Sequence, residues 1–121
     1  MSVLLAYGVL VASCTPAEDA GPSVPLEDGE YVFSHRFAEH PNISSIEVRV
    51  QLSGNRITVI NDNEDSVFPV GLLESGTLMW HSGASRWVIV ESAEELSATE
   101  VGGCSDGPTT IDLDQRIFWT C

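Results

Sequence analysis

The sequence has 121 residues, with 18 acidic side chains, five arginines and no lysine, which gives a formal net charge of −13. A surface this acidic repels nucleic acid, whose binding depends on phosphate neutralisation by Lys and Arg. It also repels an anionic lipid surface, so any attachment to a membrane must come from acyl chains. A cationic protein is the partner that such a field favours, although the simpler reading is that acidity keeps an exported protein soluble.

The first apolar stretch, residues 3–12, is too short to span a bilayer. A spanning helix needs roughly 20 apolar residues, about twice this length. A short apolar run that ends in small residues predicts the hydrophobic region and cleavage site of a secretion signal, here residues 1–13. No Lys or Arg precedes the run, which leaves open that Met1 is an internal methionine. Cleavage after Ser13 by the ordinary signal peptidase is an alternative at this point.

Residues Val11-Ala12-Ser13-Cys14 resemble the lipobox of bacterial lipoproteins. The resemblance implies that the Cys14 thiol accepts a diacylglyceryl group and that the mature protein begins there, with acyl chains such as palmitate as its lipid anchor. In enterobacterial lipoproteins, a residue such as Thr15 in place of Asp accompanies release to the outer membrane. We therefore expect a lipid-anchored protein of the bacterial cell envelope, on the periplasmic side or at the outer membrane.

Cysteine counting agrees with a lipid on the first of the three cysteines. An odd count in an exported chain leaves one thiol over, and lipidation of Cys14 leaves Cys104 and Cys121 as a pair. An oxidising compartment permits that disulfide. It would close a loop of about 18 residues, which is worth roughly 3 kcal/mol in the chain-entropy model. The alternative is that these two thiols are free.

In the segment 14–27, the lipobox resemblance implies a lipidated Cys14. The residues after it predict a disordered tether, because proline, small and acidic residues dominate them. The folded domain is predicted at 28–121, where apolar and polar residues alternate with period two between turn residues. The expected strands are 31–37, 45–52, 56–61, 67–73, 78–81, 86–90, 109–113 and 116–121, with turns at 53–55, 75–76 and 82–85 and a single helical turn at 92–97.

This spacing predicts an all-β domain of about eight strands. The connections are short enough for antiparallel neighbours, so a small meander is expected, either closed into a barrel or packed as a sandwich. Such a meander resembles the lipocalins in architecture only, because the chain carries no lipocalin motif. No repeat of fixed period points to a solenoid.

Candidate chemical sites are few. The histidines, His35, His40 and His81, are not spaced to converge on a metal, so no metal site or cofactor is expected. The acidic stretch 61–66 lacks the central glycine of a calcium loop, and no glutamate stands at the twelfth position of such a loop. It therefore predicts a solvated hairpin tip. No nucleophile elbow, phosphate loop or zinc-protease motif is present, which leaves no catalytic residue to nominate. The tryptophans either line a ligand pocket or pack in the core, the second being the simpler reading in a small domain; they are Trp80, Trp87 and Trp119.

One loop is a candidate partner-binding site. The stretch 82–87, Ser-Gly-Ala-Ser-Arg-Trp, resembles the Ser-Gly loop of the membrane-bound lysozyme-inhibitor family, which are bacterial lipoproteins with an eight-stranded barrel. The resemblance implies that this loop enters the cleft of a cationic hydrolase, although a plain hairpin turn explains the same residues. We thus expect a binding or structural module of the envelope, with a lysozyme-type inhibitor as the alternative. The residues in question are Ser82, Gly83, Ser85, Arg86 and Trp87.

Overall fold

The structure is a computed structural model that describes residues 22–121. The predicted signal at 1–13, the predicted lipid-bearing Cys14 and the first part of the tether lie outside the described residues. Seven strands and one short 3₁₀ helix make up the domain. They are β1 (Gly29–Phe37), β2 (Glu47–Ser53), β3 (Arg56–Asn61), β4 (Gly71–His81), β5 (Arg86–Val90), η2 (Ala93–Ser97), β6 (Thr109–Asp112) and β7 (Ile117–Thr120).

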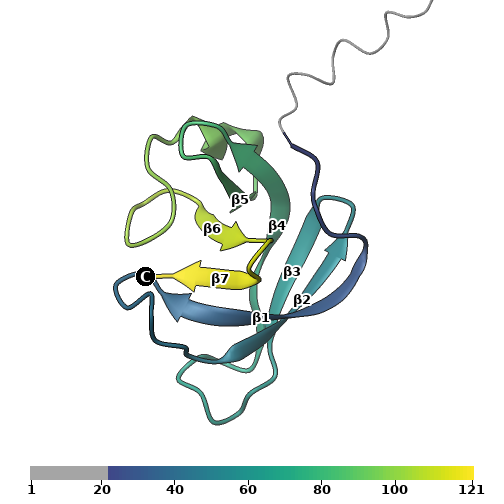
Figure 1. Cartoon of the computed structure of the whole chain (residues 1–121), viewed down its shortest axis with the longest axis vertical. Helices are drawn as coiled ribbons and strands as arrows, with labels where there is room; N and C mark the ends of the chain where they lie inside the picture. Colours follow the sequence, from purple (N-terminus) through teal and green to yellow (C-terminus); the bar gives the residue numbers. More distant parts are fainter. Residues whose placement is uncertain (1–21) are drawn as a thin grey trace, which may run out of the picture.

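The seven strands form a closed barrel (Figure 1). Each strand pairs antiparallel with the next one along the chain. The sheet closes through a parallel pairing of β1 with β7, which runs from Ser34↔Ile117 to Phe37↔Thr120. An up-and-down sheet with an odd number of strands brings its first and last strands together in the same direction, so this closure has to be parallel. The all-β prediction is confirmed. Of the two predicted alternatives the sheet forms the barrel, with seven strands where about eight were expected.

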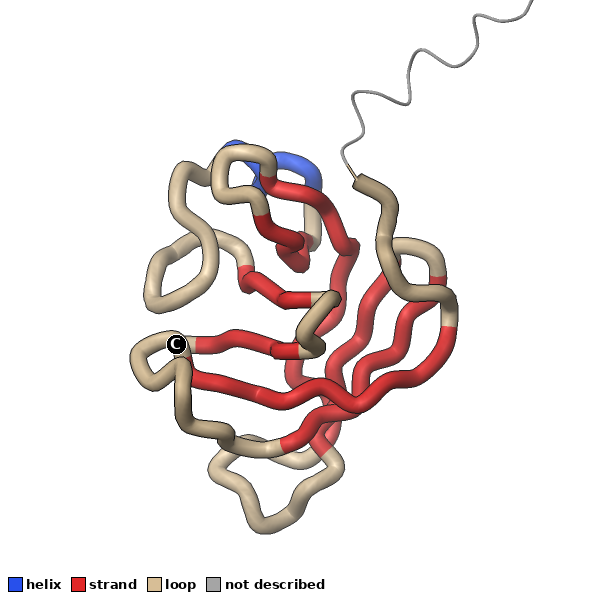
Figure 2. Tube along the Cα trace, in the orientation of Figure 1, coloured by secondary structure: helices blue, strands red, loops and turns tan. Residues whose placement is uncertain are grey.

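The core lies inside the barrel, where the period-two pattern of the sequence places it. On β2 and β3 the alternating apolar side chains form cross-strand pairs, such as Val50 with Val59 and Leu52 with Ile57. All four are buried, with at most 4% of their surface exposed. Full burial of such a side chain stabilises the fold by about 1.5–3 kcal/mol. The strands wrap around this cluster in one continuous sheet (Figure 2).

Strand β4 is one continuous strand of 11 residues, although the sequence predicted a turn at residues 75–76. Gly76 lies against β5, where an added Cβ would stand 2.5 Å from the carbonyl oxygen of Val90. The glycine therefore permits a close approach of two backbones and does not mark a turn. The β3–β4 register shifts between Val59 and Ile60, which leaves Leu73 unpaired as a β-bulge.

The strand predicted at 67–73 is wrong in its first half, because residues 62–70 form a loop. The fully buried side chain of Asn61 explains the loop. Its Nδ2 donates hydrogen bonds to Ser66 Oγ at 3.0 Å and to the carbonyl oxygens of Phe68 at 3.2 Å and Pro69 at 3.0 Å. Those carbonyls are occupied by a side chain and do not accept from a neighbouring strand.

The connection between β5 and β6, residues 91–108, contains η2 and is called the covering loop below (Figure 1). The single helical turn predicted at 92–97 is confirmed. The Glu95 carboxylate accepts a hydrogen bond from the backbone N–H of Ser92 at 3.3 Å, as the predicted capping box requires.

The covering loop lies over the outer wall of the barrel at β5 and β6. Side chains alternate between the two faces of a strand, and Ile89 belongs to the inner core. Its neighbours Val88 and Val90 therefore point outward, yet only 0% and 1% of their surface is exposed. Thr110 on β6 is likewise buried, and Gly102 of the covering loop lies directly against it. The loop thus gives the small barrel a second apolar layer on this side.

Two attachments hold the covering loop to the barrel. Cys104 and Cys121 lie at disulfide distance, with their Cα atoms 4.6 Å apart, which joins the loop to the end of the chain after β7. At the other end, the ring of His81 on β4 bonds through Nε2 to the carbonyl oxygen of Ala98 at 2.7 Å. These two attachments therefore restrict the conformational freedom of residues 98–104 in the folded state.

The packed domain begins a few residues earlier than the predicted boundary at 28. Val24 and Leu26, which the sequence assigned to the tether, are half-buried against the core cluster. The Tyr31 hydroxyl donates a hydrogen bond to the carbonyl oxygen of Glu27 at 2.6 Å, which fixes the same segment to β1. The domain therefore includes at least the last residues of the predicted tether.

Candidate functional site

The predicted Ser-Gly loop is the tight hairpin between β4 and β5. Its residues Ser82, Gly83 and Ser85 are exposed, and Ser85 has a left-handed φ of 54°. The ring of His81 holds the hairpin from beneath, since Nδ1 accepts a hydrogen bond from the backbone N–H of Ala84 at 3.0 Å. A carbonyl only accepts and an amide only donates, so a neutral imidazole with its proton on Nε2 satisfies both bonds of this ring.

A hollow of about 700 Å³ opens beside this hairpin, between the covering loop and the outer wall of the barrel. Arg86, Thr110 and Trp119 belong to the wall, from β5, β6 and β7 respectively. The opposite side is formed by residues 100–105 of the covering loop, including Cys104. The disulfide and the His81 contact thus position one side of the hollow.

A second hollow of about 160 Å³ lies at the same end of strands β5 and β6. It is lined by all three tryptophans of the chain, Trp80, Trp87 and Trp119. Trp80 and Trp87 are cross-strand partners and meet edge to face, with ring centroids 5.5 Å apart and an interplanar angle of 74°. All three rings are half-buried, so they combine packing with an accessible surface.

The two hollows share Arg86, Thr110 and Trp119, and together they are called the groove. Half-buried aromatic rings beside a few polar groups are the usual lining of a ligand site. The carboxylates that line the groove come from three places: Glu100 of the covering loop, Asp112 at the end of β6 and Asp114 in the β6–β7 turn. The groove is therefore acidic, aromatic and built from five separate segments of the chain.

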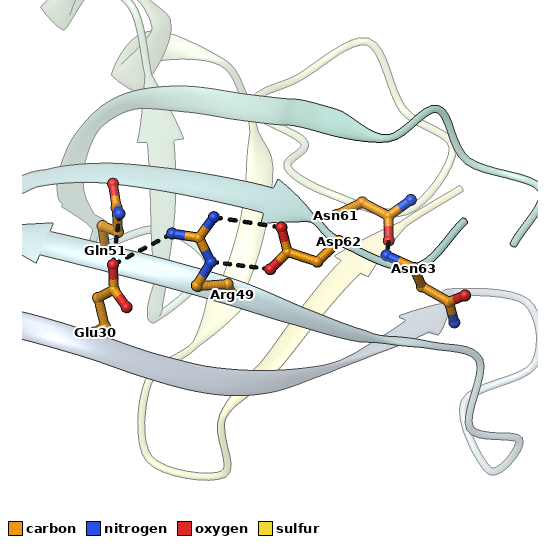
Figure 3. Close-up of polar contacts among 6 residues, drawn as sticks. All are labelled: Glu30, Arg49, Gln51, Asn61, Asp62 and Asn63. Atoms are coloured by element: carbon orange, nitrogen blue, oxygen red, sulfur yellow. Dashed lines mark hydrogen bonds and ion pairs between the residues drawn. The ribbon is translucent and has the colours of Figure 1, made fainter. Parts of the chain in front are cut away.

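Arg86 is the cation of the groove, and within residues 22–121 its guanidinium makes no hydrogen bond or ion pair. Arg49 shows the contrast on the opposite wall (Figure 3). Its guanidinium bonds to Asp62 through Nε at 2.9 Å and to Glu30 through Nη1 at 3.2 Å, and Gln51 donates to the same Glu30 oxygen at 2.7 Å. Arg49 is thus satisfied by its own wall, whereas Arg86 has its donors available for a partner.

The Arg49 cluster, which consists of Arg49, Glu30, Gln51 and Asp62, links β2 to β1 and to the end of β3 through side-chain hydrogen bonds. The hydrogen bond from Arg49 holds the pKa of Asp62 below its usual range. Exposed pairs of this kind contribute little to stability, because solvent screens them. The shallow hollow next to the cluster, lined by Val32 and Arg49 among others, is therefore a feature of the wall and not a candidate site.

Burial shifts the pKa of two groups outside the groove. His35 is fully buried, and burial lowers the pKa of its imidazole. Glu74 on β4 is half-buried, and burial raises the pKa of its carboxyl while a hydrogen bond from Thr109 Oγ1 at 3.0 Å opposes that shift. Neither residue lines the groove, so both belong to the energetics of the fold.

The histidines do not come together. Among residues 22–121, no group of three or more His, Cys, Asp or Glu side chains is placed to hold a metal ion. The His35 ring bonds to Thr120 Oγ1 inside the barrel, His81 holds the hairpin, and His40 is exposed in the β1–β2 connection.

The structure brings together only part of the predicted partner-binding stretch. Ser85, Arg86 and Trp87 line the groove, whereas Ser82 and Gly83 form the exposed tip and do not. The tryptophans combine the two alternatives of the sequence, since Trp87 packs on the core and also lines the groove with Trp80 and Trp119. The contributions of Thr110 and Glu100 were missed because nothing in their local sequence marks them.

No family model, no curated protein and no solved structure matches this chain. In the part of the chain that the structure describes, no helix is both long and apolar enough to cross a membrane. What the molecule binds is therefore inferred from the groove itself.

Proposed function

We propose that this chain is a lipid-anchored lipoprotein of the bacterial cell envelope whose β-barrel binds a partner through the groove. The observation that carries the binding role is the combination of three half-buried tryptophans and an Arg86 that is unpaired within residues 22–121, beside a covering loop that is attached at two points. A half-exposed Trp side chain forgoes part of the free energy that its full burial would contribute to folding. Three of them at one hollow indicate a surface selected for contact.

The anchoring part of the proposal rests on the lipobox-like residues 11–14, which lie outside the described residues. The first test is an intact mass of the protein extracted from membranes, with and without reductant. We expect a mass that begins at Cys14 and includes diacylglycerol and acyl chains, and a gain of two protons on reduction of Cys104–Cys121. A mass without lipid, or one that retains Met1, would overturn the anchor.

The binding part is tested by site-specific photo-crosslinking in living cells. A benzophenone amino acid in place of Pro41, which is exposed and lines the groove, should give a discrete crosslinked adduct. The matched control replaces Val67, which is 89% exposed in the β3–β4 loop and lies away from the groove. Adducts from both positions alike, or from neither, would count against a binding role for the groove.

The second candidate is an inhibitor of a cationic cell-wall hydrolase such as lysozyme. It is supported by the exposure of Ser82 and Gly83 at the tip of the β4–β5 hairpin in a chain of net charge −13. It ranks second because the barrel has seven strands, whereas that inhibitor family has eight. A turbidity assay of cell-wall lysis by lysozyme tests this candidate. Undiminished lysis at micromolar concentrations of the purified domain would rule it out.

A further inference from the structure

We infer that the groove takes a basic, extended polypeptide segment, with a lysine or arginine side chain of the partner held between the tryptophans and the groove carboxylates. This inference rests on the proposed function, because it names the class of partner for the same site. Four observations lead to it: the charge of the lining, the tryptophan cluster, the closed sheet and the unpaired Arg86.

The lining of the groove carries three carboxylates against one guanidinium. Glu100 and Asp114 are exposed, and their carboxylates make no hydrogen bond or ion pair within the described range 22–121. Asp112 accepts hydrogen bonds through Oδ1 from the backbone N–H groups of Asp114 at 3.0 Å and Gln115 at 2.8 Å, which fixes its position at the hollow. A cation entering the groove therefore meets two free carboxylates and a fixed one.

The tryptophans supply the second attraction for a cation. The face of an indole ring is the most favourable aromatic surface for an ammonium or guanidinium group. Because Trp80 and Trp87 meet edge to face, their contact uses the face of only one of the two rings. Trp119 lines both hollows from the neighbouring wall. An aliphatic stem with a cationic head, as in lysine or arginine, fits an aromatic lining that is edged by carboxylates.

The closed barrel decides how the partner is held. At the groove, strands β5, β6 and β7 are each paired with a neighbour on both sides, so this wall is not a sheet edge for strand addition. Recognition at the groove must therefore use side chains. The two hollows have Arg86, Thr110 and Trp119 in common as lining residues, so a single ligand that reaches both has to be extended.

Arg86 makes the groove selective among basic segments. Arg86 lines both hollows, and its guanidinium, which is unpaired within residues 22–121, would donate to a main-chain carbonyl or a carboxylate of the partner. A uniformly cationic run would place like charge beside Arg86. The groove therefore favours a segment in which basic residues are separated by neutral or acidic ones.

The test titrates the purified domain with three probes and follows tryptophan emission. The probes are a peptide of alternating lysine and serine, the same peptide with glutamate in place of lysine, and a neutral chitin oligosaccharide. All three tryptophans of the chain line the groove, so a change in their emission reports binding there. Binding to acidic surface elsewhere on the domain leaves the emission unchanged. We expect saturable change with the basic peptide only, weakened several-fold when salt rises from about 50 mM to about 300 mM.

Matched variants separate the groove from general acidity. The double variant E100Q/D114N should weaken basic-peptide binding about tenfold, which is the effect of losing about 1.4 kcal/mol. The control E64Q/D65N removes the same charge from exposed residues of the β3–β4 loop and should change affinity less than about twofold. Equal weakening by both pairs would overturn the inference, because the attraction would then belong to the whole surface.

The outcomes keep the inference apart from the proposed function. A change in emission with the oligosaccharide or the acidic peptide, and none with the basic one, would overturn the inference and leave a binding groove in place. No change in emission with any of the three probes, together with no crosslink from position 41, would overturn both the inference and the binding role of the groove. A thermal melt of each variant checks that the domain remains folded.

Discussion

At the scale of single residues, His35 couples the stability of the barrel to pH. Its ring is fully buried, and Nε2 bonds to Thr120 Oγ1 at 2.8 Å across the β1–β7 closure, while Nδ1 has no partner. The groups that face it are the rings of Phe37, Phe68 and Phe118, none of which carries a charge. An imidazolium in this setting would be desolvated without a compensating carboxylate.

The sign of the effect follows from the lowered pKa of His35 in the folded state. The unfolded chain binds the proton at a higher pH than the folded one, so stability is complete above the unfolded pKa and falls as the pH drops below about 6.5. We expect the melting temperature to decrease between about pH 8 and about pH 5.5.

The variant His35→Gln isolates this contribution, because glutamine does not titrate and can still reach Thr120. Melting curves of both proteins over the same pH range should converge toward acid pH. Parallel pH profiles would show that His35 does not contribute.

At the scale of elements, the contact between β4 and β5 depends on Gly76. The variant Gly76→Ala places a Cβ 2.5 Å from the Val90 carbonyl oxygen and 3.0 Å from Ile89 Cγ2. Overpacking of this kind costs about 1–3 kcal/mol, which chemical denaturation measures directly. Ser75→Ala in the same strand is the control and should cost less than about 1 kcal/mol. Equal stability of the two variants would contradict the close-approach explanation.

The disulfide belongs to the same scale, because it attaches the covering loop to the end of β7. The variant C104A/C121A frees a segment with a sequence separation of 17. It should lose about 3 kcal/mol of stability, and basic-peptide binding should weaken because one side of the groove is no longer held. The loss is measured by denaturation with and without reductant. Unchanged stability and binding would show that the His81–Ala98 contact alone positions the loop.

The elements also show how far the sequence predicts the fold and where it does not. Period-two alternation and turn residues correctly indicated β1, the β2–β3 hairpin and the helical turn, because those patterns are local. Residue 76 is a glycine because the Val90 backbone lies against it, and residues 62–70 form a loop because Asn61 bonds to the Phe68 carbonyl. No local sequence pattern reveals either contact. The sequence indicated the groove through residues 85–87 and through the tryptophans as one of two alternatives, whereas Thr110 and Glu100 reach it only through the packing of β6 and the covering loop.

At the scale of the whole molecule, the net charge of −13 opposes the compact state through self-repulsion. Raising NaCl from about 10 mM to about 500 mM screens this repulsion and should raise the melting temperature. About 1 kcal/mol corresponds to about 4–8 °C for a domain of this size. The variant E64Q/D65N should be more stable at low salt and respond less. A fall in melting temperature with salt would mean that ion pairs such as Arg49–Asp62 outweigh the repulsion.

The parallel closure of the barrel sets the order in which the chain can fold. Hairpins such as β2–β3 form within microseconds from local contacts, whereas the closure joins His35 to Thr120, 85 positions apart in sequence. Long-range pairing has to wait for the entropy of that large loop to be overcome. Until then β1 presents an unpaired edge, which is a template for association with another chain. Refolding is therefore a competition between closing the ring and pairing with a neighbour, and its yield depends on protein concentration although β1 is paired with β7 in the finished barrel.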